Sequence, residues 1–289
     1  VIPSDAELRL LREETKRMIT SIREAISKER LDADVFVGGS FAKGTLVKRE
    51  LYDVDIFVRF DWKYEDITSF LARIVKRAAG NNLDVKRIHG SRDYFQISKG
   101  KNIIFEVIPV ERIKKPREAR NVTDLSYFHV GYIKKKITPK VAREIAIAKS
   151  FCRAQGVYGA ESYIQGFSGY GLECILIHYK NFEKMANALI KVEGRIVIDP
   201  AKNYARPNDA LFAINESKLH SPVILVDPTW KERNVLAALS HESFLKFQKA
   251  LKEFVRRPSK SFFAPKTFNA GSLETRARKS GAELVHVSI

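Results

Sequence analysis

The sequence predicts an α/β (α+β) protein in which strands and helices share the first half and helices dominate the second. Short runs of β-branched and apolar residues, typical of strands, occur before residue 111, with amphipathic helical spacing before and between them. From residue 141 onward the apolar spacing is mainly helical. We therefore expect a mixed domain over residues 1–125, a mainly helical domain over 126–257 and a short C-terminal segment over 258–289.

The first half should form a sheet covered by amphipathic helices. Ser4 and Glu7 make a capping box, and apolar residues then recur at helical spacing to about residue 29. A second amphipathic helix is expected at 66–79, where Gly80 stops it. The expected strands are 35–37, 54–58, 83–88, 94–97 and 103–110.

The second half should be built mainly from helices. Helical spacing begins at Val141 and ends at the possible cap Gly156, and another helix should begin near Ser168 or Gly169. The residues that follow Val226 should lead directly into a helix at about 240–256. Further elements are expected as strands at 195–198 and 223–226, a loop at 200–209, and a loop, a short helix and a strand after residue 258.

The composition favours a soluble protein that binds a polyanion. The 289 residues carry 51 basic and 34 acidic side chains, a net charge of +17, so nucleic acid is the first candidate partner. A basic proteome or a hot habitat is the alternative explanation. No run approaches the ~20 apolar residues that span a bilayer, and the first residues lack the apolar core of a signal peptide. We expect a cytoplasmic protein with no membrane partner.

The two cysteines are expected to be buried thiols. Cys152 and Cys174 are too few and too far apart for a zinc site. A disulfide is not expected in a cytoplasmic protein.

The segment Val35 to Phe60 predicts a phosphate and metal site. A glycine-bearing loop with Ser40 and Lys43 separates two strand-like runs, and such a loop can bring backbone, hydroxyl and ammonium groups to phosphate oxygens. On the second run Asp53 and Asp55 lie two residues apart, so both carboxylates point to one face of the strand. Their mutual repulsion is relieved by a shared divalent cation, and Mg²⁺ prefers such hard oxygen ligands.

Glu106 is the one charged residue inside an otherwise apolar strand, 103–110. Because a buried unpaired carboxylate costs several kcal/mol, it should have a cationic partner. The simplest proposal is that Glu106 joins Asp53 and Asp55 as a third metal ligand. The alternative is a Glu on the exposed face of an edge strand, or one paired with a nearby Lys.

Residues 111–143 form a strongly basic stretch. Ten cations face three acidic side chains there, and phosphate neutralisation is the natural use of such a run. A solvated linker surface is the alternative.

Sequence motifs in both halves resemble those of a known family. GGSFAKGT followed by DVDIFV resembles the signature of the nucleotidyltransferase superfamily with the DNA polymerase β-like palm. YGAE, GFSGY, RNVLAALS and PSKSFFAPK resemble the archaeal class I CCA-adding enzymes, which complete the 3′ end of tRNA. The resemblance implies a palm with a mixed sheet (1–125), a helical neck (126–257) and the opening part of a body domain (258–289). Because the family continues well beyond this point, it also implies a compact or shortened member.

The resemblance assigns catalytic and nucleotide-binding roles to named residues. It implies that Asp53, Asp55 and Glu106 are the catalytic metal ligands, although the family normally has Asp where Glu106 stands. Ser40 and Lys43 would meet the triphosphate, beside Gly39, although the family usually has Arg at the position of Lys43.

Further roles are implied in the neck. His129, Lys149 and Tyr158 would bind the β- and γ-phosphates and the sugar, and Arg233 would face the base edge. The alternatives left open are a structural His129, a Lys149 that extends to solvent along its helix, a core Tyr158, and an Arg233 bound to Asp227 or Glu232.

The implied reaction extends RNA by one nucleotide and releases pyrophosphate. CTP and ATP would supply C and A residues to tRNA or tRNA acceptor-stem RNA through two Mg²⁺ ions, with no nucleic-acid template. The alternatives are a poly(A)-type enzyme or an oligonucleotide-signal synthase on the same palm, and a catalytically silent RNA-binding protein. The oligomeric state does not follow from the sequence.

Overall fold

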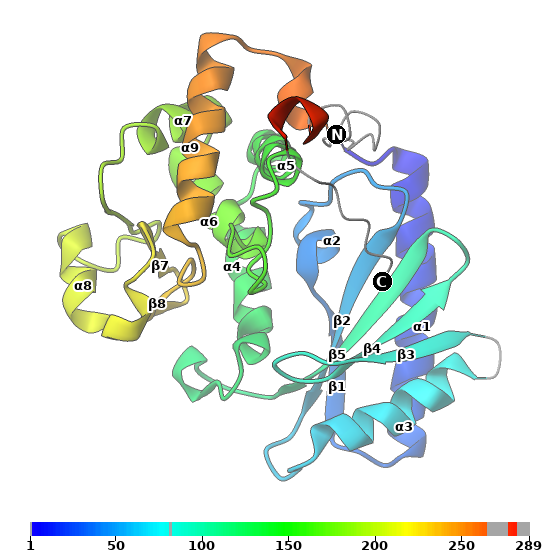
Figure 1. Ribbon diagram of the computed structural model, residues 1–289. Helices are drawn as coiled ribbons and strands as arrows, with labels where there is room; N and C mark the ends of the chain where they lie inside the picture. Colours follow the sequence, from blue (N-terminus) through cyan, green and yellow to red (C-terminus); the bar gives the residue numbers. More distant parts are fainter. Residues whose placement is uncertain (1, 81–82, 265–276, 282–289) are drawn as a thin grey trace.

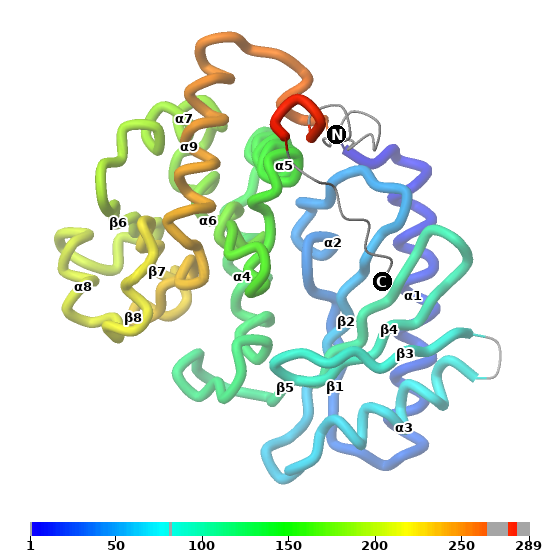
Figure 2. Tube along the Cα trace, viewed as in Figure 1, coloured from blue at the N-terminus to red at the C-terminus, as the bar shows by residue number. Residues whose placement is uncertain are grey.

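A five-stranded mixed sheet organises the first half of the chain. Figure 2 follows the path of the chain through this half. The computed structural model describes residues 2–80, 83–264 and 277–281. The sheet order is β1-β2-β5-β4-β3, with β2 and β5 parallel and the other neighbours antiparallel. Its strands are β1 (Ala33–Val37), β2 (Tyr52–Phe60), β3 (Asp84–Ile88), β4 (Tyr94–Lys99) and β5 (Ile103–Glu111).

Two long helices cover one face of this sheet (Figure 1). They are α1 (Asp5–Lys28) and α3 (Ile67–Ala79), close to the bounds that their apolar spacing predicts. The capping box of Ser4 and Glu7 is formed at the start of α1. Val54 and Ile56 of β2 are fully buried beneath these helices. The opposite face of β2 carries Asp53 and Asp55, followed by Phe57 in a small apolar cluster of its own.

The second half is mainly helical but also contains a small sheet. Its helices are α4 (Ser126–Lys136), α5 (Pro139–Ala154), α6 (Gly169–Tyr179), α7 (Phe182–Leu189), α8 (Ala210–Ala213) and α9 (His241–Arg256). Short 3₁₀ turns lie at Pro116–Glu118, Val122–Leu125, Pro207–Asp209, Glu216–Lys218 and Lys260–Phe263. The small sheet consists of β6 (Ile196–Ile198), β7 (Val223–Asp227) and β8 (Trp230–Asn234). We did not predict β8: the residues after Val226 return as an antiparallel strand before α9 begins.

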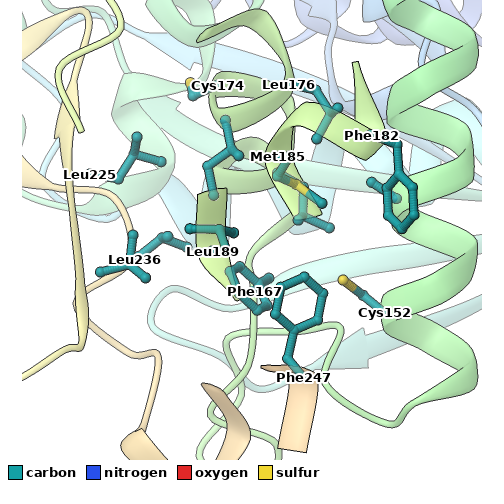
Figure 3. Packing of buried hydrophobic residues seen from close by; sticks show 14 of the residues in the cluster. Cys152, Phe167, Cys174, Leu176, Phe182, Met185, Leu189, Leu225, Leu236 and Phe247 are labelled. Atoms are coloured by element: carbon teal, nitrogen blue, oxygen red, sulfur yellow. The ribbon is translucent and has the colours of Figure 1, made fainter. Parts of the chain in front are cut away.

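The second half has its own apolar core (Figure 3). Phe167, Phe247 and Leu189 are fully buried there. Cys152 and Cys174 lie in the same core as free thiols, which confirms the prediction for both residues.

A short helix, α2 (Gly39–Lys43), connects the two halves. It follows β1, packs on β2 and also contacts α4 of the second half (Figure 1). We expected an irregular loop between β1 and β2; one helical turn and an extended segment stand there instead. This turn brings its side chains to the boundary between the two halves.

The C-terminal segment is described only in part. A helical turn is present at 277–280, where the tail was expected to form a short helix. The strand expected after it lies outside the described residues. Among the described helices, none combines the length and the apolar character that crossing a bilayer requires.

Candidate active site

Three carboxylates gather on the polar face of β2 and β5. In the parallel register Asp55 lies opposite Glu106, and Asp53 lies two residues before Asp55 on the same face. Val54 and Ile56 point to the other face, as the alternation predicts. All three carboxylates line a cavity of about 570 Å³ between the two halves. The geometry therefore brings together the acidic groups that the sequence singled out.

The carboxylates disturb one another's protonation. Burial raises the pKa of Asp55 to about 7, with a further contribution from the charge of Glu106, while Lys43 opposes the shift. Burial also raises the pKa of Glu106. Among the described residues Glu106 forms no ion pair, and its Oε1 accepts a hydrogen bond from Gln96 Nε2 at 2.9 Å. The neighbouring strand β4 supplies this amide, because Gln96 is paired with Glu106 in the sheet.

The donor set suits a hard divalent cation. Crowded carboxylates whose pKa is raised by burial and by each other gain most from a shared positive ion. Within the described ranges, no three Asp, Glu, His or Cys side chains already converge as metal ligands do. Asp53 is turned toward Arg49, with Oδ2 3.1 Å from Nη1, and both side chains are about 40% exposed. A rotation of Asp53 away from Arg49 would add its oxygens to those of Asp55 and Glu106.

Helix α2 lies directly over Asp55. Gly39 has a φ of +57°, and a β-carbon at this position would overlap the Asp55 carboxylate. A glycine is therefore required both for the left-handed backbone and for the close approach. Ser40 and Lys43, on the same turn, also line the cavity. The structure thus groups Gly39, Ser40 and Lys43 with the carboxylates, as predicted.

Lys43 and Lys149 share one buried carboxylate. Glu173 of α6 lies 2.6 Å from Lys43 Nζ and 2.8 Å from Lys149 Nζ, and its side chain is completely buried. Lys149 Nζ also donates to Thr45 O and Oγ1, at 3.1 and 3.0 Å, and Thr45 Oγ1 donates to Glu173 at 2.6 Å. Lys149 therefore does not extend to solvent along its helix: it is buried in a network that joins the two halves of the chain.

The charges of this network follow from two cations on one anion. Burial would raise the pKa of Glu173, but the ammonium groups of Lys149 and Lys43 outweigh it and lower the pKa to about 2. Burial lowers the pKa of Lys149, whereas the carboxylates of Glu173 and Asp55 keep the pKa of Lys43 above its usual value. With all three groups ionised, the network carries one net positive charge at the cavity wall.

His129 and Arg233 lie in an adjoining cavity. Both bind Asp227, whose Oδ2 is 3.1 Å from His129 Nε2 and accepts from Arg233 Nη1 at 2.7 Å. Tyr170 stacks on the His129 ring at 3.8 Å and donates to Asp227 Oδ1 at 3.2 Å. Ser168 borders both cavities. His129 also lies close to the first cavity, because the Tyr170 ring on which it stacks is 5.8 Å from Lys43 Nζ. The structure forms the Arg233–Asp227 pair that was the alternative for Arg233.

Several cavity residues were not singled out from the sequence. Tyr158 lines the cavity and was assigned to the site from the sequence. The cavity is also lined by side chains that were not assigned to it: Thr45, Arg49, Arg153, Ser168 and Glu173. Glu173 could have been predicted from the sequence, because it is an acidic residue inside the apolar run GLECILI. Arg153 had none, because an arginine on a helix is usually a surface residue.

Comparisons with known proteins agree with this architecture. Residues 19–128 match the model of the nucleotidyltransferase domain, and residues 143–264 match that of the second domain of tRNA nucleotidyltransferases. The chain is 38% identical to the CCA-adding enzyme of Nanoarchaeum equitans over 234 residues, which cover 80% of this chain and 58% of that protein. The chain is 31% identical to the CCA-adding enzyme of Saccharolobus shibatae over 259 residues, which cover 88% of this chain and 58% of that protein.

Solved structures show the same fold at low sequence identity. A cytoplasmic RNA terminal U-transferase superposes with a TM-score of 0.65 at 12% identity, over 93% of this chain and 96% of that one. Cid1, an RNA terminal uridylyl transferase, gives a TM-score of 0.68 at 10% identity, over 92% and 94%. At such identities the likeness concerns the fold alone.

Fold and site together define a nucleotidyltransferase with a polymerase β-like palm. Within that class, the chain belongs to the family of the archaeal-type class I CCA-adding enzymes. It spans a little more than half the length of the curated relatives it matches. Nucleotidyltransferases of this family depend on a metal ion.

Proposed function

We propose that this protein adds C and A residues from CTP and ATP to the 3′ end of tRNA without a nucleic-acid template. In this reaction the 3′-hydroxyl oxygen of the RNA bonds to the α-phosphorus, the bond between the α- and β-phosphates breaks, and pyrophosphate leaves. The observation that carries the proposal is the grouping of Asp53, Asp55 and Glu106 with Ser40 and Lys43 around one cavity. The relatives named CCA-adding enzyme supply the substrate class.

Asp53, Asp55 and Glu106 are the residues that would hold Mg²⁺. Bound Mg²⁺ supplies positive charge that lowers the pKa of the attacking hydroxyl and stabilises the leaving pyrophosphate. Asp55 is fixed by its contact with Gly39, whereas Asp53 can turn from Arg49. Glu106 is longer than the family's Asp by one methylene, and the hydrogen bond from Gln96 holds its carboxylate.

The triphosphate is proposed to lie along the wall formed by Ser40, Lys43, Lys149 and Tyr158. All four line the cavity that contains the carboxylates. The net positive charge of the network around Glu173 gives that wall an attraction for phosphate before any ligand arrives. Ser40 offers a hydroxyl donor, and Gly39 lets the ligand approach the backbone.

Arg233 is proposed to face the base, in the adjoining cavity. Asp227 holds the guanidinium through Oδ2, so its remaining donors keep a fixed direction. His129 binds the same carboxylate. We therefore propose that His129 orients Asp227 and Arg233 and also faces the phosphates of the nucleotide, as the resemblance implies. Fixed donors can distinguish C and A from the other bases by hydrogen bonding.

RNA is proposed to contact the elbow between α4 and α5. Lys134, Lys135, Lys136, Lys140 and Arg143 are exposed there. In the described part of the chain they form no ion pairs, so their charges are available to RNA phosphates. The basic stretch is not uniform: Arg112 is already paired with Asp32 and Asp34.

We further propose that the protein is located in the cytoplasm, where its RNA substrate would be found.

The decisive experiment incubates the protein with Mg²⁺, tRNA lacking its final residues and all four nucleoside triphosphates, one of which is labelled in each reaction. The expected product is tRNA ending in CCA, with C and A incorporated and G and U rejected. Asp55→Ala should abolish incorporation while RNA binding is kept. Asp84→Ala is the matched control, because Asp84 is an exposed aspartate on the edge strand β3.

The other products separate the rival functions. Long A tails would identify a poly(A)-type enzyme, and free oligonucleotides would identify a signal synthase. RNA binding with no incorporation would identify a silent binding protein. Unchanged incorporation by Asp55→Ala would refute the metal role of this carboxylate. Arg233→Ala should change the preference for CTP and ATP, and an equal loss for all four nucleotides would contradict base reading.

A further inference from the structure

Arg153 of α5 carries a partly buried positive charge with no carboxylate partner among the described residues. Its Nε and Nη1 atoms are shielded from solvent and make no hydrogen bond within the described residues. No carboxylate in the described part of the chain lies within ion-pair distance of the guanidinium. Buried donors of this kind are rare in folded proteins, and each calls for a physical explanation. A missing ligand is one.

The position of Arg153 in the cavity supports a ligand. The side chain lines the same cavity as Lys43 and Asp55. It follows Lys149 by four residues, so both cations extend from one face of α5. The ring of Tyr158 lies under the guanidinium, with its centroid 4.4 Å from Cζ. This cation–π contact holds the guanidinium beside the Tyr158 ring at the cavity wall.

The other cations of this wall already have carboxylate partners. Lys43 and Lys149 both bind Glu173, and Arg49 is paired with Asp53. Arg153 is therefore the cavity cation, among those described, with the most to gain from an incoming anion. Burial also lowers the pKa of the Arg153 guanidinium, as expected of a cation that lacks a counter-charge. It stays protonated, because the ordinary pKa of arginine lies far above neutrality.

We propose that Arg153 is a phosphate-binding residue of this cavity. A planar guanidinium offers several N–H donors and a permanent charge to phosphate oxygens, in a geometry that an ammonium cannot reproduce. Two sources of phosphate are compatible with the position: the triphosphate of the nucleotide and the last phosphodiester of the RNA. The assignment deepens the proposed function and rests on it for the choice of these two sources.

The test uses three full-length variants. Arg153→Gln removes the charge, and Arg153→Lys keeps the charge but loses the planar fork. Arg23→Gln makes the same charge change at an exposed arginine of α1, which lies on the covered face of the sheet away from the cavity. For the first source, the binding of inorganic tripolyphosphate is measured by calorimetry. For the second, acceptor-stem RNA is compared with the same RNA carrying an uncharged methylphosphonate at its last linkage.

Arg153→Gln should weaken binding by about 10- to 100-fold in one of the two arms, the range for a lost charge-assisted hydrogen bond. Arg153→Lys should recover part of the loss, and Arg23→Gln should bind like the wild type. A loss of tripolyphosphate binding assigns the nucleotide as the source. If the RNA phosphodiester is the source, the methylphosphonate should weaken the wild type but make no difference to Arg153→Gln.

A stability measurement separates binding from a structural role. Because Arg153→Gln removes an unpaired buried cation, the melting temperature of the ligand-free protein should stay the same or rise. A lower melting temperature with unchanged binding in both arms would overturn the proposal, and so would a wild type that binds neither probe. Normal CCA addition by Arg153→Gln with unchanged binding would overturn this inference alone. Loss of tripolyphosphate binding in a protein that adds no nucleotides would instead overturn the proposed function and leave the phosphate site standing.

Discussion

Replacing Glu173 with glutamine keeps the shape of the side chain but removes the negative charge that Lys43 and Lys149 share. Both ammonium groups would then face each other at the cavity wall, with side chains 9% and 2% exposed. Thr45 would still offer its carbonyl oxygen to Lys149. The hydrogen bonds could thus be largely kept while the charge balance is lost, so the variant isolates the electrostatic part of the network.

The size of the effect follows from the burial. Removing one partner of a buried ion pair costs about 3–5 kcal/mol, because the remaining charge is poorly hydrated. A second ammonium would add repulsion, but the pKa of Lys149 is already lowered by burial, so this group can lose its proton. The loss of this proton limits the destabilisation that the substitution causes. We therefore expect Glu173→Gln to lower the free energy of unfolding by about 3–5 kcal/mol near pH 7.

The assay is equilibrium unfolding in denaturant, followed by tryptophan fluorescence. Trp62 follows β2 in the first half and Trp230 begins β8 in the second, so each half has one reporter. Glu24→Gln, at an exposed position of α1, is the matched control and should change stability by no more than about 0.5 kcal/mol. Lys149→Met with Glu173→Leu removes a neutral pair and should cost less than Glu173→Gln alone.

The acid dependence gives a second check on the same residue. The pKa of Glu173 is lowered from 4.5 to about 2 in the folded protein. Its ionised form therefore stabilises the fold above pH 4.5, and this contribution is lost as the pH falls toward 2. The difference between wild type and Glu173→Gln should shrink over that window. A loss below about 1 kcal/mol at neutral pH, or one that grows in acid, would refute the reasoning.

Three further predictions concern the other parts of the site. Asp55→Asn should raise the free energy of unfolding of the metal-free protein near pH 8 but not near pH 4. The reason is that burial raises the pKa of Asp55 to about 7, so its ionised form destabilises the fold as the pH climbs through about 7. Denaturant titrations that give wild type and variant the same stability near pH 8 would contradict this. Gly39→Ala should cost about 1–3 kcal/mol and most of the activity, since the β-carbon meets Asp55 at a left-handed position; thermal melting and incorporation assays measure both. Asp227→Asn should lower the preference for CTP and ATP in competition assays, because Arg233 loses its anchor, whereas a general loss of binding would assign Asp227 a different role.

Local patterns predicted most of the palm. The capping box and apolar spacing of α1 and the alternation in β2 depend on nearby residues, so the sequence contains them directly. The register that brings Glu106 beside Asp55 is a long-range property, but one charge in an apolar strand was enough to suggest it. What the strand alone could not reveal is its neighbour Gln96, whose side-chain amide donates a hydrogen bond to Glu106.

The contacts between the halves were the part that sequence patterns could not supply. Glu173 meets Thr45 across 128 positions of the chain, and no local spacing encodes that meeting. The strand β8 was missed because its residues are polar and partly exposed, so it lacks the apolar alternation of a strand; pairing with β7 determines it instead. His129 and Arg233 were assigned to separate tasks, whereas the fold ties both to Asp227.

The buried thiols have a practical consequence for labelling. Cys152 and Cys174 are fully shielded, and burial raises the pKa of both, so thiolate-specific reagents should not reach them in the folded protein. A cysteine introduced on the surface could carry a fluorophore without removal of either native residue. Slow modification of the native pair would then report transient opening of the core around Phe247, independently of any change at the cavity.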